Sequence, residues 1–526
     1  MLYSFILIIK SKLMSKQTKS KAIVSIGAMI ARLREDRRMT QSDLGRKIKT
    51  TQSVIARIEK GEQNLSTGTL FKLSEALNHE IMTISKGGTI NFRIHGGYKL
   101  SGTIKVRTSK NGAVGVMCAS LLNHGTTIIR NAPRIEEVFR IKEVLENIGV
   151  KVEWNDNDLV ITPPQKIHAK NIGDESGSGM STRSCIMLIG PLIHQFKNFK
   201  VTQPGGCKLG ERTAKPYFYA LEKFGVEIKT SSKHYHISHD SLKKNREIIM
   251  YEAGDTVTET VLSVAALIPG KTKIKFASAN YQVQDICFYL EQIGVKIEGI
   301  GTGTMIVHGI SGPVKIDAEY FLSEDPIEAM SLITAAIVTK SSVTIERCPI
   351  DFLELELLKL EKMGFKYKIL KKYKADNGKT NLVDIKTFPS KLKALDEKIH
   401  ALPYPGINMD NLPFFAIIGT QAEGETFIHD WVYEERAIYY KELDKLGAET
   451  ILADPHRFYV KGPTKLQSAE IVCPPALRPS VIIMIGMLAA RGISILRNVY
   501  NINRGYEDLA ERLNALGAKI EVFRDL

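Results

Sequence analysis

One pattern recurs six times after residue 90: the end of a helix, a glycine, and the start of a strand. In residues 290–295, for example, Gly294 supplies the left-handed residue that ends a helix, and Val295 begins a strand. The intervals between successive glycines are 76, 69, 70, 83 and 70 residues. The six glycines are Gly149, Gly225, Gly294, Gly364, Gly447 and Gly517. The pattern predicts six α/β units of about 70 residues each.

Six such units exceed one ordinary domain, which predicts two lobes of three units each. A solenoid fits less well, because solenoid repeats usually span about 20–50 residues. Two lobes leave a cleft between them, and such clefts are the usual place for a substrate.

The first 90 residues differ in character from the rest of the chain. Ile26, Met29, Ile30 and Leu33 have helical spacing, and Thr40 is a good N-cap for a helix that runs through Ile48. A further helix starts at residue 50 or 51 and ends before Gly61, and another begins at 66 or 67. Residues 1–90 carry 16 Lys/Arg against 7 Asp/Glu, a net charge of +9, whereas the other 436 residues carry only +6. This all-α piece is the predicted polyanion binder.

Residues 39–45 and 51–61 resemble the helix-turn-helix domain of the phage-repressor (Xre/Cro) family. The resemblance implies that residues 22–87 bind DNA and that the helix from Thr51 enters the major groove. The same resemblance implies that bases or phosphates of the DNA are contacted by Gln52, Ser53 and Arg57, and that the DNA backbone is contacted by Gln41. DNA binding by so small a module implies a homodimer. The alternative is a helical bundle that makes protein contacts.

The remaining global features exclude several classes. The apolar run at residues 2–9 is too short for a membrane span and lacks a signal-peptide pattern, so residues 1–21 are predicted to be a disordered tail with Met14 as the true start. The six cysteines are scattered, without a CxxC motif or a Cys/His cluster. This favours a reduced, cytoplasmic protein without a zinc site. We expect neither a metal nor a cofactor.

The loop at residues 203–212 contains a candidate reactive cysteine. Cys207 follows two glycines, and the nearby Lys208 and Arg212 would favour its thiolate form. The alternative is a surface turn that happens to carry a cysteine.

The cysteine loop and the six units together resemble the enolpyruvyl transferases over residues 92–522. The closer match is the UDP-N-acetylglucosamine 1-carboxyvinyltransferase branch rather than the shikimate-pathway synthases, which lack this loop. The resemblance implies two inside-out α/β lobes that close on phosphoenolpyruvate and an acceptor. The first lobe would comprise 90–107 with 324–526, and the second, with the catalytic loop, would comprise 108–323.

The resemblance also implies roles for ten residues. The implied catalytic residues are Cys207, Asp410, Lys110 and Arg504. Those implied to bind phosphoenolpyruvate are Lys110, Asn111, Arg212, Arg436, Arg478 and Arg504. Those implied to bind the acceptor are Asn111, Arg183, Arg212, Asp410 and Val432.

The chemistry of enolpyruvyl transfer explains these residue types. Phosphoenolpyruvate is a phosphate and a carboxylate on one small molecule, which forked guanidinium groups and a lysine can bind. The acceptor hydroxyl adds to C2 while C3 is protonated, and phosphate then leaves. Cys207 would be the acid near C3, and Asp410 the base near the hydroxyl.

The acceptor side departs from the family pattern. Lys215 stands where the family has an aspartate, Asp255 and Glu259 lie in the segment that the family places near the acceptor diphosphate, and Ala476 replaces another aspartate. Carboxylates would repel a diphosphate unless they are paired. The sequence therefore leaves three functions open: transfer to UDP-N-acetylglucosamine, transfer to a different nucleotide or sugar, or a transcriptional regulator whose transferase body senses a metabolite.

Overall fold

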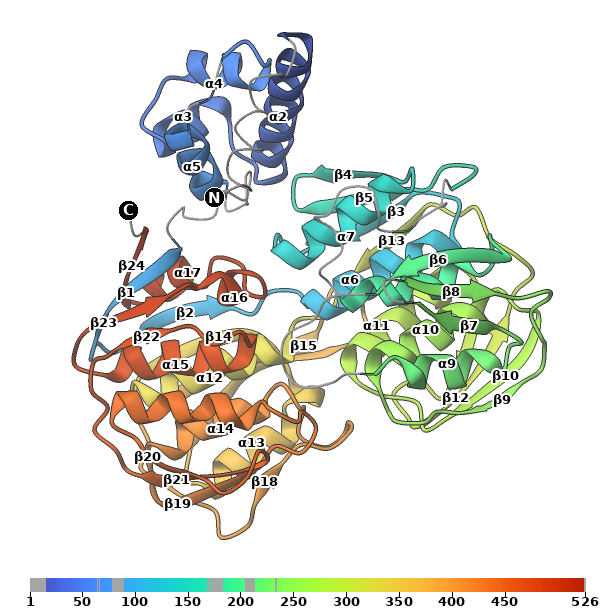
Figure 1. Cartoon of the computed structure of the whole chain (residues 1–526). Helices are drawn as coiled ribbons and strands as arrows, with labels where there is room; N and C mark the ends of the chain where they lie inside the picture. The colour runs from blue at the N-terminus through green and yellow to red at the C-terminus, as the bar shows by residue number, and fades with distance from the viewer. Residues whose placement is uncertain are drawn as a thin grey trace, which may run out of the picture. The chain divides into compact units, whose positions relative to one another are not determined.

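The computed structural model describes residues 16–63, 65, 67–77, 89–167, 172, 183–203, 213–231 and 234–524. Contacts divide the chain into two compact units, residues 91–523 and the N-terminal segment 1–90 with 524–526 (Figure 1). The proposed start Met14 and the loop residues Cys207 and Arg212 lie outside the described residues.

The N-terminal unit is all-α, as predicted. Its helices are α2 (Lys16–Asp36), α3 (Gln41–Lys47), α4 (Gln52–Glu59) and α5 (Thr67–Ala76). Thr40 caps α3 in a reciprocal capping box with Asp43, which confirms the predicted N-cap. Buried apolar residues from all four helices form one core: Ile30, Leu33, Leu44, Ile48, Ile55, Ile58, Leu70, Leu73 and Leu77. The Arg34 guanidinium ties α2 to α4 by donating to both carboxylate oxygens of Glu59, at 2.6 and 3.0 Å.

In the part of the larger unit that the structure describes there are six small sheets, three of them built from residues 127–321 and three from residues 90–105 and 342–524. The first three are β13 (Ala318–Phe321), β3 (Thr127–Arg130), β5 (Asp158–Thr162), β4 (Lys151–Asn155); β6 (Asn198–Thr202), β8 (His234–Ser238), β7 (Glu227–Thr230); and β11 (Lys296–Glu298), β12 (Thr304–Gly309), β10 (Gly270–Lys275), β9 (Glu247–Ile249).

The other three sheets follow in the same notation. They are β22 (Glu470–Val472), β23 (Gly492–Arg497), β1 (Ile90–Gly96), β24 (Lys519–Arg524); β15 (Lys366–Lys374), β16 (Asn381–Phe388), β14 (Ser342–Pro349), β2 (Ser101–Lys105); and β17 (Leu392–Lys393), β19 (Ala422–His429), β21 (Arg457–Gly462), β20 (Glu449–Leu452), with β18 (Ile399–His400) beside β19.

The sheets share one plan, in which a central strand has a parallel neighbour on one side and an antiparallel strand on the other. In one sheet, for example, β3 pairs parallel with β13 and antiparallel with β5. In the sheet of β6 the parallel neighbour is a single bridge between Ile172 and Val201. The sheet of β22, β23 and β24 is completed by β1, which pairs with β23 although the two strands lie about 400 residues apart. The first strand of this unit therefore completes the sheet at its C-terminal end.

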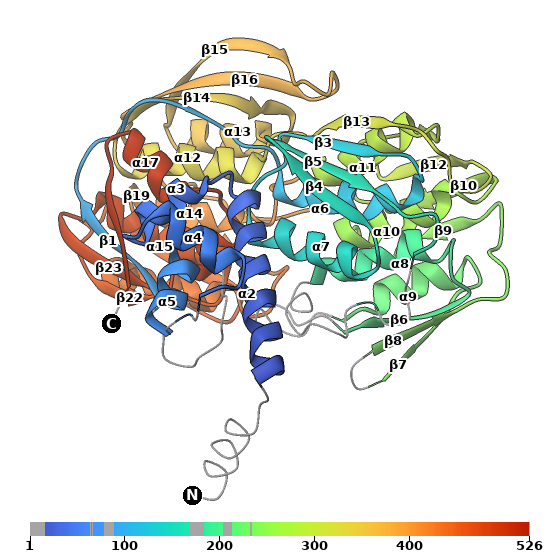
Figure 2. The ribbon, with the colours of Figure 1, turned by 90° about the horizontal axis from the view of Figure 1, so that it is seen from above.

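Helices lie inside this unit and the sheets lie outside (Figures 1 and 2). The inner helices are α6 (Lys110–Ala119), α8 (Ile189–Leu192), α10 (Asp255–Ala266), α12 (Pro326–Val338), α14 (Leu412–Gly419) and α15 (Leu477–Ala489). Every residue of α12 and α14 is buried, so these helices are enclosed on all sides rather than amphipathic. The predicted fold class, a two-lobed inside-out α/β structure preceded by an all-α module, is confirmed.

A second set of six helices carries the repeated glycines. These six helices are α7 (Glu136–Asn147), α9 (Lys215–Glu222), α11 (Tyr281–Gln292), α13 (Glu354–Lys362), η5 (Ala437–Leu446) and α17 (Leu509–Ala515). Four shorter helical segments lie outside this set: η1 (Ser120–Leu122), η3 (Arg183–Leu188), η4 (Ile350–Phe352) and α16 (Tyr500–Asn503). All six glycines have φ between 83° and 98°. Each N–H donates to the carbonyl three residues back, and the next N–H donates five back, which is the Schellman motif.

Five cysteines lie buried in the core as free thiols: Cys118, Cys185, Cys287, Cys348 and Cys473. Within the described ranges, no helix is both long and apolar enough to cross a membrane. The same residues contain no group of three or more His, Cys, Asp or Glu side chains arranged to hold a metal ion.

Gly294 offers a clean test of the glycine caps, because a Cβ there would meet no atom within 4 Å while φ is +94°. We expect Gly294→Ala to lower the free energy of unfolding by about 1–2 kcal/mol through backbone strain alone. Gly303→Ala in the neighbouring turn is the control, because its φ is outside the left-handed region. Equal urea midpoints for the two variants would contradict the account.

Candidate active site

A cavity of about 860 Å³ opens within the larger unit. It is lined by residues from both halves of this unit, 110–282 and 327–504. Several inner helices begin at its wall. First-turn residues that line it are Lys110 and Asn111 of α6, Asp255, Thr256 and Val257 of α10, Ile327 of α12, and Leu477, Arg478 and Pro479 of α15. The N-terminal ends of helices carry partial positive charge and unpaired N–H groups, so this wall favours anions.

Eight of the ten residues predicted for the site line this one cavity. They are Lys110, Asn111, Arg183, Asp410, Val432, Arg436, Arg478 and Arg504. Cys207 and Arg212 lie outside the described residues. The fold thus brings together side chains that are almost 400 residues apart, while their individual roles stay predictions.

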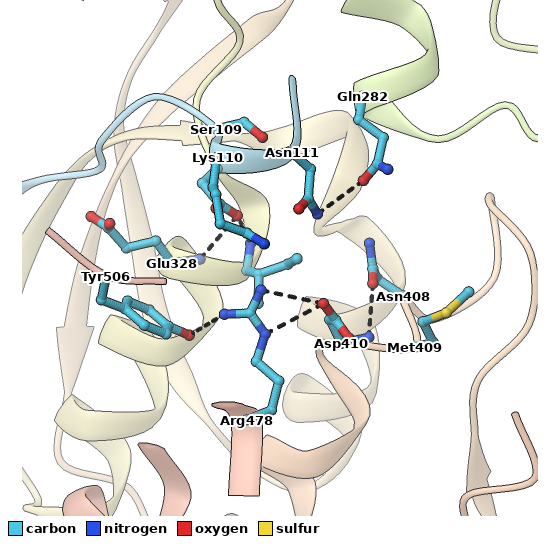
Figure 3. Close-up of polar contacts among 12 residues, drawn as sticks. Ser109, Lys110, Asn111, Gln282, Glu328, Asn408, Met409, Asp410, Arg478 and Tyr506 are labelled. Carbon is cyan, nitrogen blue, oxygen red and sulfur yellow. Dashed lines mark hydrogen bonds and ion pairs between the residues drawn. The ribbon is translucent and has the colours of Figure 1, made fainter. Parts of the chain in front are cut away.

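Asp410 lies between two buried arginines (Figure 3). The Arg478 Nε and Nη2 donate to Asp410 Oδ2 at 3.4 and 3.2 Å, and the Arg436 Nη1 lies 3.5 Å from Oδ1. The backbone N–H of Asp410 donates to the Asn408 side chain at 2.9 Å, which fixes the loop before α14. Burial by itself would raise the pKa of Asp410, but the charges of Arg478, Arg436 and Lys110 outweigh it and lower the pKa. The group is therefore a carboxylate at neutral pH.

Each arginine is also held from behind. Arg436, which is 1% exposed, donates Nε and Nη2 to the two oxygens of Asp430 at 2.6 and 2.8 Å. The Tyr440 hydroxyl donates to the same carboxylate. Arg478 donates Nη1 to the Tyr506 hydroxyl at 2.8 Å. These partners leave Nη1 of Arg436, and Nε and Nη2 of Arg478, directed at Asp410.

The first turn of α6 supplies the opposite wall of the cavity. The Ser109 hydroxyl caps this helix by accepting from the Gly112 N–H at 3.0 Å. The Lys110 Nζ donates to Glu137 Oε2 at 2.9 Å. The Asn111 Nδ2 donates to the Tyr281 hydroxyl at 3.0 Å and to Gln282 Oε1 at 3.1 Å. The Asn111 carbonyl oxygen is therefore the part of this amide that is left to accept from a ligand.

Sequence reasoning missed the residues that hold these side chains, chiefly Glu137, Asp430 and Tyr506. No spacing or motif links Glu137 to Lys110 or Tyr506 to Arg478. Asp430 stands six residues before Arg436, which is no regular helical or strand spacing. Their partnerships arise only in the folded chain.

The acceptor side differs in part from the sequence interpretation. Asp255 lines the cavity and accepts from Ser278 and from Asn280, and burial raises its pKa against these two hydrogen bonds. Glu259, by contrast, is a buried residue of α10 that is 1% exposed, and it does not line the cavity. Lys215 is exposed and does not line the cavity either. Of these three changed residues, only Asp255 lines the cavity.

In the N-terminal unit, the residues predicted to bind DNA cluster around α4. Gln52, Ser53 and Arg57 are exposed. The Gln41 Nε2 donates to Glu59 at 2.9 Å, and the Gln52 Nε2 donates to Gln41 Oε1 at 2.7 Å. This chain of hydrogen bonds fixes the Gln52 amide at the start of α4.

Comparison with known proteins identifies the larger unit. The EPSP synthase (3-phosphoshikimate 1-carboxyvinyltransferase) family model matches residues 94–513. The chain belongs to this family. A helix-turn-helix model matches residues 30–80, in agreement with the predicted N-terminal module.

Relatives of this EPSP synthase family member include UDP-N-acetylglucosamine 1-carboxyvinyltransferases. That of Treponema denticola is 32% identical over 434 residues, which cover 82% of this chain and 98% of the relative. That of Bradyrhizobium diazoefficiens is 31% identical over 441 residues, with the same coverage. The solved enolpyruvyl transferase NikO from Streptomyces tendae superimposes with a TM-score of 0.71 over 84% of this chain and 100% of its own, at 22% identity. The structural likeness bears on the fold alone.

The Arg436–Asp430 pair can be tested by removing its carboxylate. We expect Asp430→Ala to lower the free energy of unfolding by about 3–5 kcal/mol, because it leaves a buried guanidinium without its main partner. Glu449→Ala, which breaks the exposed pair with Lys461, serves as control and should change it by less than about 1 kcal/mol. Urea unfolding measures both. Comparable losses in the two variants would contradict the structural role of Asp430.

Proposed function

We propose that this enolpyruvyl transferase family member transfers the carboxyvinyl group of phosphoenolpyruvate to a hydroxyl of UDP-N-acetylglucosamine or a related acceptor, and releases phosphate. The observation that carries the proposal is Asp410, an ionised carboxylate placed between Arg436 and Arg478 in a cavity rich in cations. With UDP-N-acetylglucosamine as acceptor, the reaction would belong to peptidoglycan precursor synthesis and hence to cell-wall biogenesis.

The residues divide the work between the two substrates. Lys110, Arg436, Arg478 and Arg504 would hold the phosphate and carboxylate of the donor, and Arg504 would take part in catalysis with Lys110. The acceptor hydroxyl would add to C2 of phosphoenolpyruvate and lose its proton to Asp410, while C3 takes a proton from the Cys207 thiol. Return of a C3 proton to the Cys207 thiolate and cleavage of the bond from C2 to the phosphate oxygen would then give the enol ether and phosphate. The cationic cluster stabilises the phosphate as it leaves.

Binding of phosphoenolpyruvate would also raise the pKa of the base, Asp410. Arg436 and Arg478 lower the pKa of Asp410 in the structure described, which makes it a weak base. When the donor anions share these guanidinium groups, Asp410 loses part of that stabilisation and its pKa rises. Asp410 would thus become a competent base only when phosphoenolpyruvate is in place.

The acceptor remains the open part of the proposal. A cavity of about 860 Å³ is large enough for a nucleotide sugar beside the small donor. Asn111, Arg183 and Val432, to which the resemblance gives an acceptor-binding role, line the cavity together with the carboxyl group of Asp255. This carboxylate favours an acceptor with hydroxyl or amide donors over a bare diphosphate at that point.

The test is phosphate release from phosphoenolpyruvate in the presence of a panel of nucleotide sugars that includes UDP-N-acetylglucosamine. We expect release with at least one acceptor, and a kcat about 100-fold or more lower for Asp410→Asn, because the base is lost while the fold is kept. The exposed Asp396→Asn is the control and should retain full activity.

Two outcomes would overturn this proposal. Failure to release phosphate with any acceptor would do so, and phosphoenolpyruvate binding without turnover would favour a metabolite sensor. An Asp410→Asn variant as active as the wild type would remove Asp410 from the mechanism.

We propose DNA binding as a second function, carried by residues 22–87. On α4, the exposed Ser53 and Arg57 are four residues apart and therefore share one face of the helix that would enter the major groove, and the exposed Gln52 flanks that face at the first position of the helix. The net charge of +9 on residues 1–90 supports binding to a polyanion.

A gel-shift experiment with the DNA upstream of the protein's own gene tests this function. We expect Arg57→Ala to weaken the complex about tenfold, because one phosphate or base contact is lost. Lys60→Ala, just beyond the C-terminal end of α4, is the matched control and should bind nearly as well as the wild type. A shift unchanged by Arg57→Ala would count against α4 as the reading helix.

A further inference from the structure

The modest net charge of the transferase unit conceals one strongly basic segment. Residues 366–393 contain nine lysines and two aspartates, a net charge of +7. Because residues 91–526 total +6, the remainder of that unit carries about −1. Five of the nine lysines are exposed on the single strand β15: Lys366, Lys368, Lys371, Lys372 and Lys374.

The strand presents these lysines at the edge of its sheet. The strand order is β15, β16, β14, β2, and Figure 2 shows β15 at the outer rim with β16 behind it. A register shift after Ile369 places Lys371 opposite Asp384, two residues from the partner of Lys368, so Lys371 stays on the face that carries Lys368. At about 3.3 Å per residue, nine residues extend over about 30 Å.

The charge on this strand is not balanced by carboxylates. Among the residues that the structure describes, none of the five lysines forms an ion pair. Lys368 lies directly opposite Lys386, an arrangement of like charges that destabilises a sheet. Asp384 lies opposite Lys371, but its carboxylate accepts from the Tyr373 hydroxyl at 2.6 Å and the Arg347 N–H at 3.1 Å. A bound polyanion would relieve the repulsion along the strand.

The other repeats provide internal controls, because the corresponding strand follows the repeat glycine in each. The second and fourth residues after the glycine are one lysine and one glutamate in four of the six repeats: 151 and 153, 227 and 229, 296 and 298, 519 and 521. Three of these pairs are ion pairs, at 2.8, 3.0 and 3.3 Å. In β15 both positions are lysine.

This comparison weakens the ordinary explanation for lysines on a sheet edge. Edge strands often carry lysine because charge prevents pairing with another chain. Here β4, β7 and β11 are also edge strands, and balanced Lys/Glu pairs are enough for them. Edge protection therefore does not require five unpaired lysines on β15.

We propose that β15 is a second DNA-contacting surface, which binds the phosphate backbone of duplex DNA. Duplex DNA is favoured over other polyanions because the same chain carries a helix-turn-helix unit, and a covalently linked second site acts at high effective concentration. Lysines give point-charge contacts to phosphates, which bind without reading sequence. The proposal is independent of enolpyruvyl transfer, and it does not require the helix-turn-helix unit to recognise a specific operator.

The test uses the full chain and a fluorescein-labelled 30-base-pair duplex of arbitrary sequence, with binding followed by anisotropy over a range of KCl concentrations. The β15 variant changes Lys366, Lys368, Lys371, Lys372 and Lys374 to Gln. The control variant removes the same charge from other exposed strands, by changing Lys151, Lys229, Lys273, Lys296 and Lys461 to Gln. Comparison of the two separates a local surface from an effect of net charge.

We expect the slope of log affinity against log salt to become shallower by about four in the β15 variant and by less than about one in the control. Affinity at about 100 mM KCl should fall at least tenfold in the β15 variant only. The double variant Lys366→Gln/Lys368→Gln should lose about two units of slope with an unchanged melting temperature, which guards against misfolding. The same change in slope should persist in an Arg57→Ala background.

Equal slopes for the β15 and control variants would overturn the proposal. So would a β15 variant that binds the duplex normally but no longer binds vesicles of phosphatidylglycerol, because the strand would then face a membrane surface. Persistence of the effect when Arg57→Ala has weakened the specific gel-shift complex would show that β15 acts apart from the helix-turn-helix unit.

Discussion

The pairing of two buried arginines with carboxylates is the interaction on which the rest of the site depends. Arg436 and Arg478 are 1% and 5% exposed, and a buried guanidinium is tolerated only when it is paired. Asp430 holds two nitrogens of Arg436, and Tyr506 holds one of Arg478. The nitrogens that remain converge on Asp410. An anionic donor can compete for these nitrogens, because it offers the charge that Asp410 supplies in its absence.

The fold positions this concentration of positive charge around the cavity. Buried inner helices, among them α12 and α15, begin at the cavity wall, so their N-terminal dipoles add to the side-chain charges. The sheets that cover these helices are small and share one plan, each with a glycine-capped helix. The repeated unit builds the scaffold, and the first turns and loops of individual units provide the chemistry.

The sequence predicted what depends on local signals and missed what depends on tertiary contacts. The glycine caps and the Thr40 cap were predictable, because each is set by a few adjacent residues. The resemblance to a family located the residues that line the cavity. Asp430 and Glu137 were missed because their partners are defined only once distant elements meet. The lysines of β15 are evident in the sequence, but the net charge of +6 over residues 91–526 conceals them because the rest of that segment is close to neutral.

The measurement that tests the central claim most directly follows the carbon atoms of the donor. Wild-type protein is incubated with phosphoenolpyruvate labelled with carbon-13 at C2 and with the accepted nucleotide sugar, and the products are observed by NMR. The account predicts that the label moves to an enol ether carbon bonded to the acceptor oxygen, in step with phosphate release. Label that stays in phosphoenolpyruvate, or that appears only in pyruvate, would contradict it.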